Sequence, residues 1–339
     1  MYPGQEKGRT GDYSMTPEQK KQEFLEEAAK CRPEDRSTLG REEQDGILEK
    51  LDELYGTADQ LSLRNAVLYR RILILLSVAA TLVTFAFLLY DEAEQHWMIL
   101  ICGIMILCLF SINRIAKKLE CHGKYLEYRV LAEAARVQYY VHYSGSRLRI
   151  SDIFPWPLQM SVPWVKPMIE EIMAKAVPGP KRSIRDCWIA DQRQYHIRAL
   201  AKTKKKSAVN NRIVFIALVL AIALYVFALL FEVRFAGLLT GNSMIGEETT
   251  GLIRTILKIL LGTVSAATLF TGNYFGKLSL DNAAEDHQRM ILLYDKALEV
   301  IGAEGETDAM ILRLAREELN ENSSWYSYQS VNTPNISLG

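Results

Sequence analysis

The chain has 339 residues, of which 49% are hydrophobic, and its 40 basic and 40 acidic side chains give a formal net charge of zero. This balance argues against a nucleic-acid-binding protein, which normally needs a surplus of positive charge to neutralise phosphates. Five cysteines without paired spacing favour small buried side chains over disulfides or a metal site. The polar first residues, which lack an apolar core, predict that there is no signal peptide.

The first 40 residues are expected to form a polar, partly disordered segment that contains a short helix near residues 17–30. Apolar residues then follow a 4-3 spacing that leads to the first long apolar run, at Ile47, Leu51, Leu54, Ala58, Leu61 and Leu68. This pattern has two interpretations, a coiled coil or packing against another helix. Gly56 interrupts the pattern and weakens the prediction of a coiled coil. Because the heptads are few, we favour packing against a helix expected at residues 124–141.

Four apolar runs come near the length of about 20 residues that a helix needs to cross a bilayer. They lie at residues 72–90, 97–112, 213–231 and about 255–275. A buried helix of a soluble protein is the weaker alternative, because such helices rarely stay apolar on every side. The fourth run contains Gly, Ser, Thr and Asn and is entered past Arg254 and Lys258, so we expect it to insert only together with its neighbours.

Basic residues gather at those ends of the four runs that adjoin the long polar segments. They are Arg70, Arg71, Arg114, Lys117, Lys118, Lys202, Lys204, Lys205, Lys206, Arg212 and Lys277. The loop at residues 91–96 is acidic, and Arg254 and Lys258 count against this asymmetry but are outnumbered. The positive-inside rule therefore predicts that both termini and the middle segment are cytoplasmic.

The stretch at 124–145 predicts a one-faced helix that continues a membrane helix into the cytoplasm as a stalk. Its apolar stripe consists of Leu126, Val130, Ala134, Val137 and Val141, and Arg129, Glu133 and Arg136 flank the stripe. Residues 146–187 are expected to be an irregular connector with one short helix at 167–176. A long helix then enters the third run, and further helices are expected near 281–302 and 307–319.

These elements predict an all-α membrane protein, with two transmembrane helical hairpins that carry long cytoplasmic helical extensions. The expected parts are the N-terminal segment 1–40, a first hairpin unit 41–145, a connector 146–187, a second hairpin unit 188–320 and a tail 321–339. Both hairpin units have the same order of elements: long helix, span, short outer loop, span, long helix.

No set of residues predicts an active site, a cofactor or a metal site, and we expect that the chain is not an enzyme. The fourth run instead has a polar stripe with residues four, three, three and four apart: Lys258, Gly262, Ser265, Thr268 and Gly272. Small residues allow helices to pack closely, whereas the same stripe facing water would line a pore. Lys258 favours water slightly, because its ammonium needs solvent or a partner.

Three sequence stretches resemble motifs of SLATT-type bacterial membrane proteins and the related DUF4231 group. "YLEYRVLAEAARVQYYVHYSG" is similar to their "YR-x-LAE-x-LR" helix through Tyr128, Arg129, Leu131, Ala132, Glu133 and Arg136, with Ala135 at a position where the pattern often has Leu. "WIADQRQYHIRALAKTKKK" resembles the "W-x-x-x-Q-x-x-Y" helix through Trp188, Gln192 and Tyr195. "LNENSSWYSY" resembles the "EN-x-x-W" ending through Glu321, Asn322 and Trp325.

The resemblance implies a homo-oligomeric, pore-forming, multi-pass effector in the bacterial inner (plasma) membrane, part of an antiviral conflict system. It also implies that a partner protein or a nucleotide second messenger provides the signal, although the sequence contains no separate sensor domain. The motif residues Tyr128, Arg129, Glu133, Arg136, Trp188, Gln192 and Tyr195 would then belong to the cytoplasmic stalk. Two alternatives stay open: a non-conducting scaffold that binds the bilayer and partners and, least favoured, a membrane enzyme.

Overall fold

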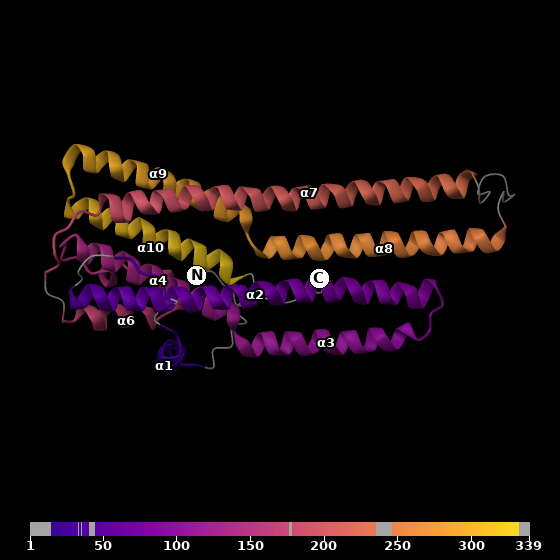
Figure 1. Ribbon diagram of the computed structural model, residues 1–339, viewed down its shortest axis with the longest axis horizontal. Helices are drawn as coiled ribbons and strands as arrows, with labels where there is room; N and C mark the ends of the chain where they lie inside the picture. The colour runs from indigo at the N-terminus through magenta and orange to yellow at the C-terminus, as the bar shows by residue number, and fades with distance from the viewer. Residues whose placement is uncertain are drawn as a thin grey trace, which may run out of the picture. The chain divides into compact units, whose positions relative to one another are not determined.

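The computed structural model describes residues 15–331 except 33, 35, 41–44, 176–177 and 235–245. The first 14 residues of the N-terminal segment 1–40, which was expected to be partly disordered, and residues 332–339 of the tail lie outside the described residues. Every regular element that is described is a helix, as the sequence predicts. They are α1 Pro17–Ala28, α2 Gly46–Glu92, α3 Met98–Leu119, α4 Cys121–Tyr143, α5 Trp156–Ser161, α6 Val165–Met173, α7 Asp191–Arg234, α8 Glu247–Lys277, α9 Leu280–Glu304 and α10 Asp308–Ser330 (Figure 1).

Four helical stretches, which include α2, α3, α7 and α8, are long and apolar enough to cross a membrane. None of the residues in the most apolar window of α7 is buried, and large side chains such as Phe215, Leu107 and Leu269 are about two-thirds exposed. Exposure of so much contiguous apolar surface is unfavourable in water but is expected in lipid. The four candidate spans therefore indicate a multi-pass membrane protein.

Contacts within the chain divide it into two compact units. Unit 1 consists of Met1–Arg64, Lys124–Asp191 and Asp295–Ser327, and unit 2 consists of Asn65–Gly123, Gln192–Tyr294 and Tyr328–Gly339. Each unit takes segments from both halves of the sequence. Unit 2 contains all four apolar runs together with the polar first part of α7, and unit 1 contains the first part of α2 and most of α4 and α10.

Helix α4 is the central helix of unit 1, and the prediction of one buried face is wrong. The predicted stripe is buried, but so are Leu131, Ala132 and Ala135, which lie on other faces. The cause is that α4 has neighbours on several sides. The Ser62 hydroxyl on α2 donates to the backbone oxygen of Tyr125 (3.0 Å), and the Tyr125 ring meets Trp325 of α10 edge to face.

The 4-3 spacing in α2 is explained by packing within the chain, as we expected. Every residue of that pattern from Ile47 to Leu61 is buried, whereas Leu68 is exposed. Gly56, which weakens the helix locally, is needed for a close approach, because a Cβ atom there would lie 2.3 Å from the backbone oxygen of Ser37. The segment before α2 therefore packs directly on its backbone.

The connector contains more helix than the sequence indicates. It forms a 3₁₀ turn at Ile150–Asp152, α5, and α6 at the place of the predicted short helix, and it ends in a π-helical turn, Arg185–Ala190, that leads into α7. The connector lies close to the end of α4, because a Cβ atom at Gly179 would come within 1.8 Å of the His142 backbone oxygen. Such a contact permits only glycine.

Helix α10 extends to Ser330 and is eleven residues longer at its C-terminal end than the predicted 307–319 helix. It begins with a side-chain cap, since the Thr307 hydroxyl accepts a hydrogen bond from the Met310 backbone N–H (3.3 Å). It continues because Leu319, Asn322 and Ser323 are buried in unit 1. The polar composition of residues 320–330 had indicated a tail, and packing against unit 1 overrides that composition.

The core of unit 2 lies where α2 approaches the end of α3 and the start of α4. The buried cluster consists of Tyr69, Ile72, Leu73, Leu76, Ala116 and Cys121, with Leu109, Ile112 and Tyr274 packed against it. Helix α3 runs beside the second half of α2 (Figure 1), and the Cys102 thiol contacts the Val83 backbone oxygen at 3.9 Å. Helix α8 contributes Tyr274 to this core.

Candidate functional site

The polar stripe of α8 packs against α2 at one end. The Lys258 ammonium forms an ion pair with the Glu92 carboxylate (2.8 Å), and the Thr255 hydroxyl donates to the Glu92 backbone oxygen (3.2 Å). One turn further, a Cβ atom at Gly262 would lie 2.7 Å from Cδ1 of Leu88. The small residue at 262 therefore permits close helix packing, which is the first of the two interpretations of the stripe.

The other half of the stripe has a different environment. Ser265 and Gly272 are exposed, and a Cβ atom at Gly272 would meet no atom within 4 Å. The Thr268 hydroxyl donates to the backbone oxygen of Val264 one turn earlier (2.8 Å). Among the described residues, the five predicted residues thus do not share one contact surface, and Ser265 and Gly272 are exposed.

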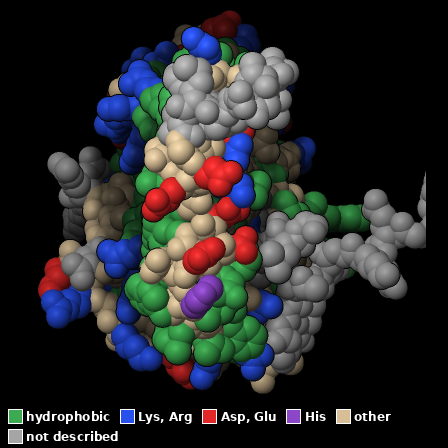
Figure 2. Space-filling view, turned by 90° about the vertical axis from the view of Figure 1, so that its right-hand side faces the viewer, with side chains coloured by type: hydrophobic (Ala, Val, Ile, Leu, Met, Phe, Trp, Pro, Cys, Tyr) green, Lys and Arg blue, Asp and Glu red, His purple; other side chains and the backbone are tan. Residues whose placement is uncertain are grey.

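A second cation of α8 is also paired. The Arg254 guanidinium makes two contacts of 2.6 Å with the two carboxylate oxygens of Glu232 on α7. Figure 2 views the right-hand side of Figure 1, where the α2–α3 connection lies and α8 begins, and it shows acidic side chains gathered there with basic ones among them. Both cations that opposed the predicted charge asymmetry, Arg254 and Lys258, therefore have acidic partners.

Four stalk residues predicted from the family motif lie in the core of unit 1. Arg129, Glu133 and Arg136 form a charged network with Asp59 of α2 and Glu318 of α10. Arg129 pairs with Asp59 (2.8 Å) and with Glu133, and Arg136 pairs with Glu133 (2.6 Å) and with Glu318 (3.3 Å). All of these residues except Arg129 are buried. The network therefore links α2, α4 and α10 through charges that water largely does not reach.

The fourth of these residues, Tyr128, lies in an aromatic cluster beside this network. Its ring meets Phe24 of α1 at 5.3 Å and Trp164 at 6.3 Å, and the Trp164 indole N–H donates to Glu127 (2.9 Å). Burial raises the pKa of Tyr128 above its usual value. Burial, with the charge of Asp59, also raises the pKa of Tyr55 to about 12. These residues contribute packing and buried polar groups to unit 1.

The remaining motif residues are divided between the two units. Trp188 is fully buried in unit 1, where its ring stacks on Tyr140 with centroids 5.3 Å apart and planes 8° from parallel. Gln192 is buried in unit 2, whereas Tyr195 is 40% exposed. The sequence motif therefore marks a place where α7 passes from one unit to the other.

Among the contacts that the sequence did not predict is one between two histidines of unit 2. Nδ1 of His196 on α7 lies 3.1 Å from Nδ1 of His287 on α9, although the two are 91 positions apart. No local spacing signals such a pair. Within the described part of the chain, no group of three or more His, Cys, Asp or Glu residues is placed to hold a metal ion.

Comparison of the chain with family models, with curated proteins and with solved structures gives no match.

The contacts described above define a candidate site with two parts. One is the exposed half of the α8 stripe in unit 2, and the other is the charged network in unit 1.

Proposed function

We propose that the chain is a homo-oligomeric pore-forming protein of the bacterial inner membrane, similar to SLATT-type effectors of antiviral conflict systems. A cytoplasmic signal, from a partner protein or a nucleotide second messenger, would open a pore that is closed at rest. Helices α2 with α3 and α7 with α8 would form the two transmembrane hairpins, and the polar helices would be their cytoplasmic extensions.

The exposed half of the α8 stripe carries this proposal. Helix α8 is the least apolar of the four candidate spans, yet the described part of the chain leaves Ser265 and Gly272 exposed. Polar residues are disfavoured against lipid and normally face other helices or a water-filled cavity. Assembly of several copies with their α8 helices towards a common axis would remove this surface from lipid and line a water path.

The charged network supports a regulated pore. Helix α2 runs without a break from the buried network into the first candidate span, so a change in unit 1 acts directly on a membrane helix. Buried charge pairs have few alternative partners, and breaking one is costly. We propose that the network of Asp59, Arg129, Glu133, Arg136 and Glu318 stabilises the closed state and that the signal rearranges it.

The proposed topology places both termini and the connector in the cytoplasm. The acidic partners of Arg254 and Lys258 favour it, because these two cations then add little net charge to the outer side. Reporter fusions at Gly179 and after Gly339 should read cytoplasmic, and one at Gly241, which lies outside the described residues, should read external. An external signal at Gly179 would contradict the topology.

Cysteine accessibility tests the water path. Cysteines at Ser265 and Thr268, in a chain whose Cys102 and Cys108 are replaced, should react with membrane-impermeant thiol reagents mainly in the open state. Leucine at Ser265 should reduce conduction and preserve assembly, because it narrows and dries the path without adding charge. Unreactive cysteines in every state, with a conducting Ser265→Leu protein, would remove α8 from the pore.

A non-conducting membrane scaffold is the second candidate, and the close approach of Gly262 to Leu88 favours it. In that case the α8 stripe serves helix packing throughout. Leucine at Ser265 would then separate neighbouring copies and break the oligomer, which size-exclusion chromatography of the detergent-solubilised protein distinguishes from a blocked but assembled pore.

A further inference from the structure

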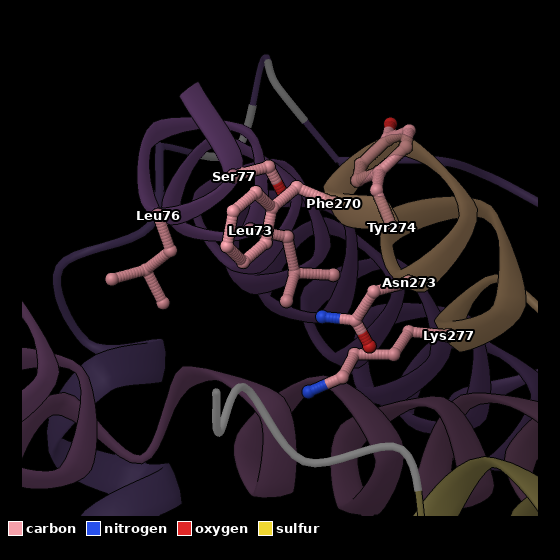
Figure 3. A pocket seen from close by; sticks show the side chains of 7 residues that line it. All are labelled: Leu73, Leu76, Ser77, Phe270, Asn273, Tyr274 and Lys277. Carbon is pink, nitrogen blue, oxygen red and sulfur yellow. The ribbon is translucent and has the colours of Figure 1, made fainter. Parts of the chain in front are cut away.

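A shallow pocket lies between α2 and α8 in unit 2. Its lining consists of Leu73, Leu76, Ser77, Phe270, Asn273, Tyr274 and Lys277. Figure 3 shows the leucines and the Phe270 ring on one side, with the Asn273 amide and the Lys277 ammonium both extending from α8 on the other. The pocket thus joins an apolar wall to a polar, cationic rim.

The pocket lies at the boundary of two candidate spans. The first apolar run begins at Ile72, one residue before Leu73, and the fourth ends near residue 275, two residues before Lys277. The apolar wall therefore belongs to the membrane-spanning part of both helices, and Lys277 lies just outside it. Tyr274, half-buried beside Lys277, is a residue type that is enriched at this depth of a membrane protein.

The charged residue in the lining of the pocket is Lys277, and it is partly withdrawn from water. Burial lowers the pKa of Lys277, and its charge contributes to the low pKa of the neighbouring His122, about 4, for which burial is the main cause. A bound anion would favour the charged form of Lys277, which burial disfavours.

We propose that this pocket binds one anionic phospholipid, with the phosphate on Lys277 and Asn273 and the first acyl carbons on Leu73, Leu76 and Phe270. Basic pockets between membrane helices on the cytoplasmic side are suited to such head groups. The apolar wall and its position at the end of the spans identify the ligand as a lipid, because a free phosphate would gain nothing from the leucines. The inference depends on the assignment of the spans within the proposed function, and it does not require conduction.

Binding of lipid to the full-length protein in nonionic detergent tests this inference. Native mass spectrometry would measure the affinities of phosphatidylglycerol and phosphatidylcholine, with inorganic phosphate as a competitor. We expect phosphatidylglycerol to bind at least about fivefold more tightly than phosphatidylcholine. Lys277→Gln should weaken the binding of phosphatidylglycerol about fivefold, which is the effect expected for the loss of one cation near a phosphate. Lys277→Arg should retain binding, because it keeps the charge.

The matched control is Lys117→Gln, an exposed cation in the last turn of α3 that does not line the pocket. It should leave the affinity unchanged. Equal losses for Lys277→Gln and Lys117→Gln, equal affinity for both lipids, or full competition by millimolar phosphate would each overturn the inference. If Lys277→Gln does not yield folded protein, Asn273→Leu replaces it with the same expectation. A protein that binds the lipid but does not conduct would contradict the proposed function alone.

Discussion

Replacement of Arg136 by methionine should strongly destabilise unit 1. Arg136 is buried and lies between two buried carboxylates, with its guanidinium 2.6 Å from Glu133 and 3.3 Å from Glu318. Methionine fills similar space but removes the positive charge, so both carboxylates lose this partner while they remain buried. Removal of one member of a buried ion pair costs about 3–5 kcal/mol.

The size of the expected effect can be measured as a melting temperature. Unit 1 is of the size at which 1 kcal/mol corresponds to about 2–4 °C, so Arg136→Met should lower the melting temperature by about 6–20 °C. Intrinsic tryptophan fluorescence is a suitable probe, because Trp164 and Trp188 are both buried in this unit. The assay is thermal unfolding of the full-length protein in detergent.

Two further variants separate loss of the ion pairs from a general packing defect. Arg136→Lys keeps the charge and should have an intermediate melting temperature, because Lys lacks the planar fork of Arg. The double variant Arg136→Met with Glu318→Met should be about 1–3 kcal/mol more stable than the sum of the single effects predicts. A melting temperature of Arg136→Met within about 2 °C of the wild type would refute the reasoning.

Two further variants test the packing of unit 1, and Gly123→Ala, at the end of a segment of unit 2, is the control for the first of them. Gly56→Ala should lower the free energy of unfolding by about 1–3 kcal/mol, because its Cβ would lie 2.3 Å from the Ser37 backbone oxygen. Gly123→Ala, whose Cβ would have no atom within 4 Å, should be neutral or stabilising by about 0.5–1 kcal/mol. Thermal unfolding compares the two variants, and equal shifts in melting temperature would contradict the contact between Gly56 and Ser37. Val130 and Val137 are fully buried, and aspartate at both positions should abolish assembly or expression, because each substitution would bury a charge without a partner. A double variant with a normal size-exclusion profile would show that these positions are not in a core.

The sequence predicts the membrane helices well because their signal is local. Long apolar runs, their flanking charges and the 4-3 spacing of α2 depend only on neighbouring residues, and the helices found at these places agree with them. The reason for a glycine at position 56 could not be predicted in this way. Its cost to the helix is visible in the sequence, whereas the backbone oxygen of Ser37 that requires it is a tertiary contact.

The environment of the charged residues in α4 could not be predicted from periodicity. Arg129, Glu133 and Arg136 are spaced like surface ion pairs on a solvated helix face. Their partners Asp59 and Glu318 lie 70 and 182 positions away from the arginines that they contact. Because these partners compensate the charges, α4 can be buried on nearly every side, and a one-faced helix was the wrong expectation. The length of α10 was underestimated for the same reason, since its polar last turns are held by tertiary packing.

Single-channel recording in planar bilayers tests the central claim, a regulated pore lined by α8, most directly. The minor state of a two-state protein is typically populated at about 0.1–10%, so brief openings should occur even without the signal. We predict discrete conductance steps for the wild-type protein and none, or much smaller ones, for Ser265→Leu that is still assembled. Bilayers that contain the assembled wild-type protein and stay electrically silent over prolonged recording across a range of voltages would contradict the claim and favour the non-conducting scaffold.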